Sequence, residues 1–179
     1  VVPYGDIPLD KDKVGENVYI DILNHARDFV HIMTPYLILD GELLHALKFA
    51  AERGVDVSII MPGIPDKKSA YYLAKTYYPT LLASGVKIYE YTPGFVHATV
   101  FVSDNSRAVV GTINLDYRSF YHHFECGVYL EGVQEIKKME ADFLGTMALS
   151  QRITLEDVRK EKKFTKILGW TMKIFAPLM

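Results

Sequence analysis

In the first half of the chain, segments whose hydrophobic residues recur with helical spacing alternate with short apolar runs that are typical of strands. The apolar positions Val18, Ile22 and Phe29 have helical spacing and predict a helix over 16–28, which leads into a strand at 30–34. The same reasoning predicts strands at 55–61 and 86–91, a helix from the N-cap Asp40 to Arg53, and a helix over 66–83. A strand–helix–strand–helix–strand order is typical of parallel strands joined by crossover helices.

The second half has shorter connections between its apolar runs. It predicts strands at 96–103, 109–110 and 122–130, and then a helix near 131–149. The residues before the first helix, VVPYGDIPLDKDK, have neither an initiator methionine nor a signal-type apolar core, and we interpret them as a cut or a linker. The whole pattern predicts an α/β fold with helices covering a sheet.

Composition narrows the class of protein. A chain of 179 residues with 49% hydrophobic and 23% charged residues fits one globular domain. It contains no apolar run of about eighteen residues, the length that a membrane-spanning helix needs. Cys126 is the single cysteine, so no internal disulfide is expected, and it is interpreted as a small core residue.

Charge divides the chain into two unequal parts. Residues 158–179 hold six Lys or Arg against Glu161, a net charge of +5, whereas the preceding residues carry −7. We therefore predict a domain over 1–157 and a basic amphipathic tail over 158–179. An acidic domain is a poor partner for nucleic acid, whereas a basic amphipathic helix suits an anionic membrane surface or, equally, covers a protein core.

The most informative stretch is HATVFVSDNSRAVVGTIN, residues 97–114. In a strand here, His97 and Thr99 would share one face, and Asn114 would follow just after the next turn. A histidine and an amide placed in this way can converge on one anion. Gly111 would allow a close backbone approach at the same turn.

This spacing resembles the phospholipase D superfamily motif, H-x-K-x4-D-x6-G-[ST]-x-N, with Thr99 in the position of the lysine. Further segments, including TPYLILDGELLHALKFAAERGVDVSIIMPG and TINLDYRS…HFECGV, resemble the C-terminal half of bacterial cardiolipin synthases over essentially the whole chain. The resemblance implies a mixed sheet flanked by helices. It also implies a membrane-associated enzyme that transfers a phosphatidyl group between two phosphatidylglycerols, without cofactor or metal. That family carries two copies of the motif, and this chain carries one.

The resemblance assigns roles to the motif residues. His97 is the nucleophile that forms a phosphohistidine-type intermediate, Asn114 and Thr112 bind the substrate phosphate, and Asp104 completes the motif, as a turn residue as much as a chemical one. Thr99 offers a hydroxyl donor where the family has a full positive charge. Glu125, a carboxylate in an apolar strand, needs a partner, and we expect it to orient His97 unless it simply faces solvent.

Three interpretations remain open. The chain is part of a cardiolipin synthase completed by a missing N-terminal half, or a phospholipase D-type phosphodiesterase or nuclease completed by a second copy of itself, or a catalytically silent module. His122 and His123 are expected to point to opposite faces of a strand, so they cannot bind a metal together, and no metal site is predicted. A second proton-transferring group is not predicted either, because the chain carries no second copy of the motif. The isolated chain is therefore expected not to convert phosphatidylglycerol to cardiolipin.

Overall fold

The computed structural model describes residues 1–9, 12–161, 163–174 and 176–178. Its secondary structure is, in chain order, β1 Val2–Asp6, α1 Val14–His25, β2 Phe29–Met33, α2 Gly41–Glu52, β3 Asp56–Pro62, α3 Lys68–Lys75, α4 Tyr78–Ala83, β4 Lys87–Tyr91, β5 Val100–Ser103, β6 Arg107–Gly111, α5 Tyr117–Tyr121, β7 Glu125–Glu131, α6 Glu135–Ala148, β8 Ser150–Ile153, α7 Leu155–Lys160 and α8 Lys163–Lys173. Among the described helices, none combines the length and the apolar character that crossing a bilayer requires.

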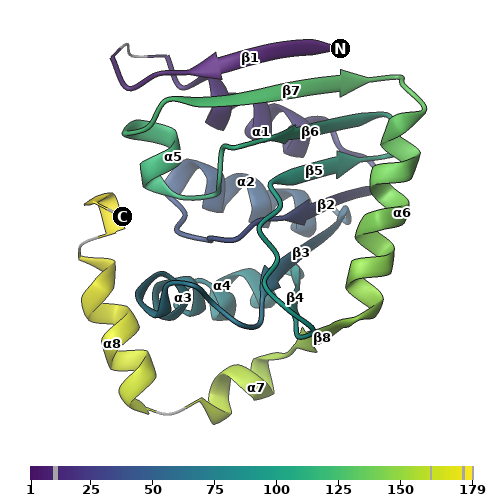
Figure 1. Ribbon diagram of the computed structural model, residues 1–179. Coiled ribbons are helices and arrows are strands. Elements are labelled where there is room, and N and C mark those ends of the chain that lie inside the picture. Colours follow the sequence, from purple (N-terminus) through teal and green to yellow (C-terminus); the bar gives the residue numbers. More distant parts are fainter. Residues whose placement is uncertain (10–11, 162, 175, 179) are drawn as a thin grey trace.

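The strands form one mixed sheet in the order β1-β7-β6-β5-β2-β3-β4-β8 (Figure 1). Strands β2, β3 and β4 are parallel neighbours, as the alternation of helices and strands predicts. Every other pairing in the sheet is antiparallel. The expected α/β fold with a mixed sheet and flanking helices is confirmed.

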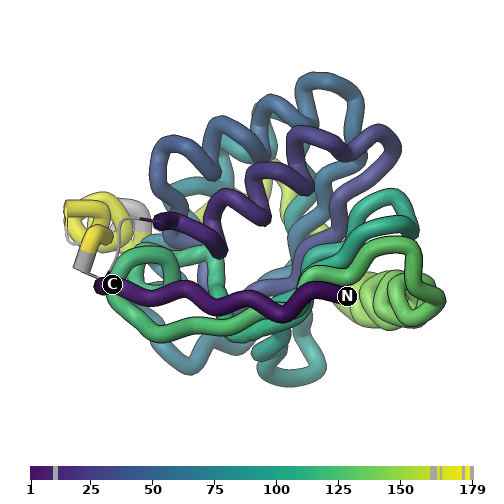
Figure 2. Tube along the Cα trace, turned by 90° about the horizontal axis from the view of Figure 1, so that it is seen from above, coloured from purple at the N-terminus to yellow at the C-terminus, as the bar shows by residue number. Residues whose placement is uncertain are grey.

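Helices cover both faces of this sheet (Figure 2). The larger core lies between the sheet and the helices α1, α2, α3 and α4, with Tyr19 stacked on Phe101 at 4.1 Å between ring centroids. The helix α6 covers the other face, where Phe143 packs on Met33 and Ile60. Because β2 and β3 are covered on both faces, their sequences are nearly continuous apolar runs.

Several local predictions are wrong. The residues interpreted as a linker form β1, which pairs with β7, and the helix expected over 66–83 is two helices, α3 and α4. The motif strand begins at Val100 rather than at residue 96, and the strand expected over 122–130 begins at Glu125 after the short helix α5. Cys126, expected in the core, is exposed.

The basic tail is packed against the domain. The helix α8 lies against α3, where a Cβ on Gly169 would come within 2.5 Å of the Tyr72 carbonyl oxygen. The predicted boundary at 157/158 falls within α7. Lys162 and Phe175, which belong to the predicted tail, lie outside the described residues.

Candidate functional site

Residues from distant parts of the chain line a pocket of about 300 Å³ at one end of the sheet. Its walls come from the segments that follow β2 and β3, from the segment before β5, and from both sides of α5. The polar side chains that line it include those of Tyr36, Lys67, His97, Asn114, Arg118 and His123.

Asn114 is held rigidly between two buried neighbours. Ile113 and Leu115 are both fully buried. The Tyr19 hydroxyl donates to the Ile113 carbonyl at 2.7 Å, and the Ile38 N–H donates to the Leu115 carbonyl at 2.7 Å. With the backbone fixed on either side, the Asn114 side chain has a defined position at the pocket.

Thr99 contacts Asn114 and not the pocket itself. Its hydroxyl donates to Asn114 Oδ1 at 2.9 Å, and the residue is only 5% exposed. Because this bond uses the amide oxygen, the amide NH₂ of Asn114 remains available as a donor. The structure thus brings together two of the predicted phosphate-binding residues, with Thr99 orienting the amide.

His97 precedes β5 in an irregular segment and is exposed at the pocket. Its ring meets Tyr36 and Phe95 edge-on, with centroid distances of 6.3 and 5.5 Å. These aromatic contacts restrict the ring and leave its nitrogens accessible, which a nucleophile requires.

The expected pairing of Glu125 with His97 is wrong. Among the described residues, Glu125 accepts a hydrogen bond from the Thr112 hydroxyl, and its other oxygen, Oε1, lies 3.5 Å from His123 Nδ1. The Glu125 side chain is only 8% exposed. Thr112, expected to bind the phosphate, is therefore committed to Glu125.

Asp104 lies at the far end of β5 from His97. Its carboxylate accepts hydrogen bonds from the backbone N–H groups of Arg27, Asp28 and Phe29, at 2.9 to 3.0 Å. Its φ of 52° is the left-handed turn conformation, which Asp tolerates. These contacts fit the predicted role of Asp104 as a turn residue, and they connect the end of β5 to the start of β2.

Sequence reasoning missed Lys67 and His123 as side chains of the pocket, and it interpreted Arg118, which could approach a headgroup phosphate, more simply as a solvated surface group. Lys67 lies 5.4 Å from the centre of the Tyr36 ring, whose hydroxyl is anchored to Asp66 at 2.6 Å. The sequence did contain a signal for Lys67, because it follows a predicted parallel strand, and the loops after parallel strands such as β2 and β3 meet at one edge of the sheet. Lys67 and Arg118 place at the pocket the positive charge that Thr99 lacks.

The helix α5 organises one wall of the pocket. Asp116 is its N-cap and accepts from the Ser119 N–H at 2.7 Å. Burial raises the pKa of Asp116 despite this bond.

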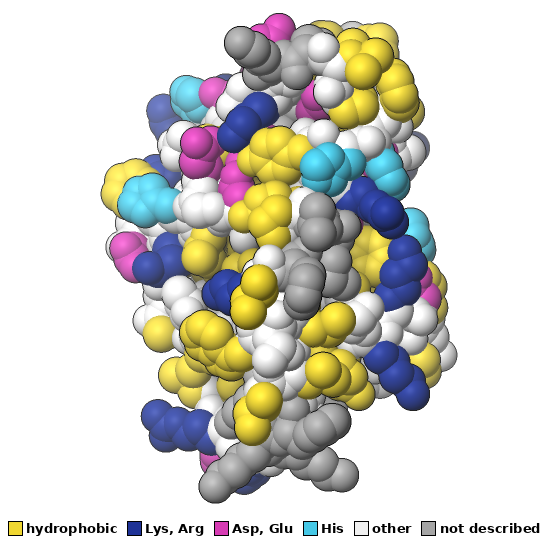
Figure 3. Space-filling model, turned by 90° about the vertical axis from the view of Figure 1, so that its left-hand side faces the viewer, with side chains coloured by type: hydrophobic (Ala, Val, Ile, Leu, Met, Phe, Trp, Pro, Cys, Tyr) yellow, Lys and Arg dark blue, Asp and Glu magenta, His cyan; other side chains and the backbone are white. Residues whose placement is uncertain are grey.

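Figure 3 looks onto this end of the molecule, where histidine and Lys or Arg side chains lie close together. The pocket is therefore suited to an anion.

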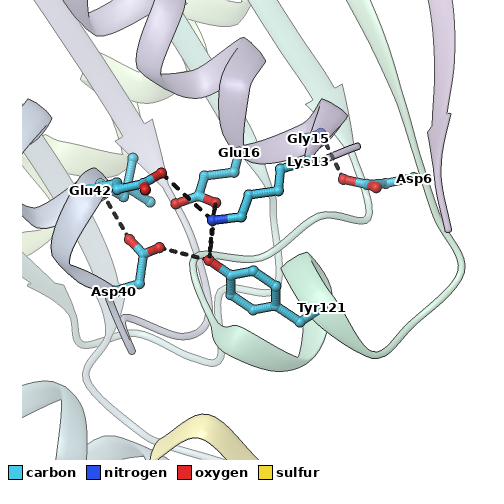
Figure 4. Close-up of polar contacts among 8 residues, drawn as sticks. Asp6, Lys13, Gly15, Glu16, Asp40, Glu42 and Tyr121 are labelled. Carbon is cyan, nitrogen blue, oxygen red and sulfur yellow. Dashed lines mark hydrogen bonds and ion pairs between the residues drawn. The ribbon is translucent and has the colours of Figure 1, made fainter. Parts of the chain in front are cut away.

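A second polar cluster lies at the other end of α5, where Tyr121 meets α1 and α2 (Figure 4). The Tyr121 hydroxyl donates to Asp40 at 2.7 Å and lies 3.1 Å from Glu16. The carboxylates of Glu16, Asp40 and Glu42 lie within 4.8 Å of one another, a grouping able to hold a metal ion that the sequence did not predict. The cation that the structure places among them is the Lys13 ammonium, 3.5 Å from Glu16 and 3.6 Å from Glu42.

This cluster predicts a pH-dependent stability. Burial and the neighbouring Asp40 carboxylate raise the pKa of Glu16 to about 7, from 4.5. The protonated form of Glu16 thus stabilises the fold fully below pH 4.5, and that contribution is lost as the pH rises through 7. Glu16→Gln mimics the protonated form, so between pH 5 and pH 8 the variant should gain about 2 kcal/mol relative to the native chain.

The measurement is the free energy of unfolding in urea at both pH values. Glu52→Gln, on the exposed end of α2, is the control and should keep a constant difference from the native chain. A constant difference for Glu16→Gln as well would mean that Glu16 titrates normally.

Comparisons with known proteins agree with this geometry. Residues 19–147 match the family model described as "Cardiolipin synthase, PLD-like domain". An uncharacterised protein of Streptococcus mutans serotype c is 64% identical over the whole chain, which covers 39% of that protein. Cardiolipin synthase 2 of Bacillus anthracis is 37% identical over 96% of the chain, which covers 34% of the relative. The chain thus spans between a third and two fifths of the length of these relatives.

Solved structures support the same fold. Phosphatidylserine synthase of Haemophilus influenzae superposes on 99% of the chain, covering 47% of that protein, with a TM-score of 0.76 at 14% identity. Nuc of Salmonella typhimurium, a phospholipase D family member, superposes on 86% of the chain and 99% of its own length, with a TM-score of 0.70 at 17% identity. From its sequence match and its fold, the chain belongs to the phospholipase D-like cardiolipin synthase family.

Proposed function

We propose that this chain is the C-terminal catalytic part of a cardiolipin synthase, which transfers a phosphatidyl group from one phosphatidylglycerol to another and releases glycerol. The observation that carries the proposal is the convergence of His97, the Asn114 amide and the Lys67 and Arg118 cations on one pocket. A phosphodiester is an anion that resists attack, so it needs both a nucleophile and fixed donors or cations around its oxygens.

In the proposed reaction His97 attacks phosphorus and glycerol leaves. The hydroxyl of a second phosphatidylglycerol then attacks the phosphohistidine, which forms cardiolipin and frees His97. Asn114 donates to a phosphate oxygen, while Lys67 and Arg118 stabilise the charge that develops on the others. Glu125 and Thr112 support the wall of the pocket through their mutual hydrogen bond.

The experiment replaces the matching 39% of the Streptococcus mutans relative with this chain and measures cardiolipin and glycerol formed from phosphatidylglycerol vesicles. At 64% identity the exchanged part should fold against the rest of that protein. The expected result is cardiolipin and glycerol in equal amounts. If the unmodified relative makes cardiolipin and the folded chimera makes none, the proposal fails.

A phosphodiesterase or nuclease completed by a second copy is the alternative, and the fold similarity to Nuc permits it. The acidic charge of residues 1–157 disfavours a polyanionic nucleic acid as the substrate. The match of the family model to cardiolipin synthases over residues 19–147 also favours a phospholipid.

We also propose that the enzyme meets the membrane through α8. The helix packs on α3, while Ile167 and Trp170 on α8 and Ile174 directly after it are 63%, 64% and 77% exposed. Hydrophobic side chains are visible on the lower part of the face in Figure 3, where α8 lies. An exposed apolar stripe on a basic helix suits an anionic bilayer surface.

Trp170 is the single tryptophan of the chain, so its fluorescence reports on α8 directly. Vesicles containing phosphatidylglycerol should shift its emission to the blue, and added salt should weaken the binding. The double change Ile167→Ser and Ile174→Ser should weaken binding by about tenfold or more, since two apolar side chains no longer enter the bilayer. Leu149→Ser, on an equally exposed leucine outside α8, is the control; equal loss from both variants would contradict a specific role for α8.

A further inference from the structure

The cluster of carboxylates beside Tyr121 is a site separate from the phosphate pocket. Glu16 lies in the first turn of α1, Asp40 is the N-cap of α2, and Glu42 lies in the first turn of α2. Their oxygens lie within 4.8 Å of one another, and none of the three residues lines the pocket that contains His97. We propose that Glu16, Asp40 and Glu42 bind a divalent cation, Ca²⁺.

The burial of Glu16 is the observation that points to a bound ion. Its side chain is 0% exposed, and among the described residues no hydrogen-bond donor contacts its oxygen Oε1. In Figure 4 this oxygen carries no dashed line and lies on the side of Asp40 and Glu42. Leaving a fully buried carboxylate oxygen without a partner costs free energy, so buried carboxylates in proteins are paired or bind metal ions.

The neighbouring donors do not satisfy Glu16. The Tyr121 hydroxyl has one proton, and its contact with Asp40, at 2.7 Å, is shorter than its contact with Glu16, at 3.1 Å. The Lys13 ammonium lies 3.5 Å from the other Glu16 oxygen, Oε2, which is longer than an ordinary hydrogen bond. Three ionised carboxylates and one ammonium have a net formal charge of −2, which one divalent cation balances.

The donor set suits Ca²⁺. All three side chains offer oxygen, and oxygens as far as 4.8 Å apart can share one ion when each Ca–O distance is about 2.3 to 2.6 Å. Mg²⁺ requires shorter distances, about 2.0 to 2.1 Å, and near-ideal octahedral geometry. The Glu42 side chain is 65% exposed, so the ion can enter from solvent and keep water ligands on that side.

A bound ion would connect three elements of the fold. The carboxylates come from α1 and α2, and Tyr121, which contacts two of them, is at the end of α5. The same helix carries Arg118, which lines the phosphate pocket. Ca²⁺ would hold the end of α5 against α1 and α2 and, because it binds the folded state, would stabilise the chain. This role does not depend on the proposed reaction.

The test uses the 179-residue chain, freed of metal with EDTA and titrated with CaCl₂ at pH 8 by calorimetry. About one Ca²⁺ per chain should bind, with a dissociation constant below about 1 mM. Glu16→Gln should lose this binding, and Glu42→Gln, at an exposed ligand, should weaken it by about tenfold or more. Glu52→Gln, at the exposed end of the same helix as Glu42, is the matched control and should bind Ca²⁺ like the native chain.

Two results of the titration would overturn the proposal. Equal weakening by Glu42→Gln and Glu52→Gln would mean that Ca²⁺ is attracted by the acidic surface in general and not by this cluster. No binding by the native chain would overturn it as well. Binding by Lys13→Met alone would then identify the Lys13 ammonium as the cation that the cluster holds.

Unfolding in urea gives a second measurement. Added Ca²⁺ should raise the urea midpoint of the native chain and of Glu52→Gln, and it should leave the midpoint of Glu16→Gln unchanged. An equal rise in Glu16→Gln and in the native chain would place the stabilising ion elsewhere on the molecule, which contradicts the proposed site.

Discussion

Replacing His97 with alanine is expected to lower cardiolipin formation by the chimeric enzyme by about a thousandfold or more. A nucleophile that forms a covalent intermediate has no substitute among the surrounding donors, so its loss removes the first step entirely. The other groups, Asn114, Lys67 and Arg118, would still bind the substrate phosphate. The fall should therefore appear in kcat, with a much smaller change in KM.

His97 is exposed, and among the described residues its ring–ring contacts are with Tyr36 and Phe95, so the variant should keep its thermal stability. His45→Ala is the matched control, because His45 is an exposed histidine on α2 that stacks on Phe49 outside the pocket. Residual activity within tenfold of the parent in a folded His97→Ala chimera would rule out His97 as the nucleophile.

The second large effect is expected from Gly111→Ala. A Cβ at Gly111 would lie 2.4 Å from the Cys126 carbonyl oxygen and 2.7 Å from the Gly127 Cα. Both are backbone atoms of β7, so no side chain can move aside, and β6 and β7 must separate. We expect a loss of about 3 kcal/mol in the free energy of unfolding, measured in urea.

Gly145→Ala supplies the control. Gly145 lies in α6, and a Cβ there meets nothing within 4 Å, so alanine should stabilise the helix by about 0.5 to 1 kcal/mol. If the two variants unfold at the same denaturant concentration, the close approach of β6 and β7 at Gly111 is wrong. Because Gly111 leads directly to Thr112 and Asn114, the destabilised variant should also bind inorganic phosphate less tightly.

The sequence predicted a close backbone approach at Gly111, but it did not predict which segment approaches it. The neighbour is strand β7, fifteen residues further along the chain at Cys126. A similar limit applies to β1, whose pairing with β7 joins residues more than a hundred positions apart, such as Val2 and Tyr129. Local periodicity contains no signal for such a pair, and Pro3 and Gly5 weaken the strand pattern further.

Contacts between residues that lie close together in the sequence were easier to predict. Thr99 and Asn114 are separated by one turn between β5 and β6, so their spacing alone placed them near each other, and the structure joins them at 2.9 Å. The pairing of Glu125 could not be settled in this way. From the sequence, a carboxylate at the start of β7 could contact either His97 or His123. The helix α5 ends just before His123, and this places His123 beside Glu125.

The amino-acid sequence by itself determined the family, the parallel order of β2, β3 and β4, and the identity of the motif that includes His97, Thr99 and Asn114, because each depends on short-range spacing and periodicity. Only the tertiary structure decided which charges surround that motif. Lys67 comes from the loop after β3, Arg118 from α5 and His123 from the turn after α5, and the distances between these segments depend on how the strands are ordered in the sheet. Strand order is set by the burial of whole sheet faces against α1, α2 and α6, a long-range energy that no local stretch of sequence contains.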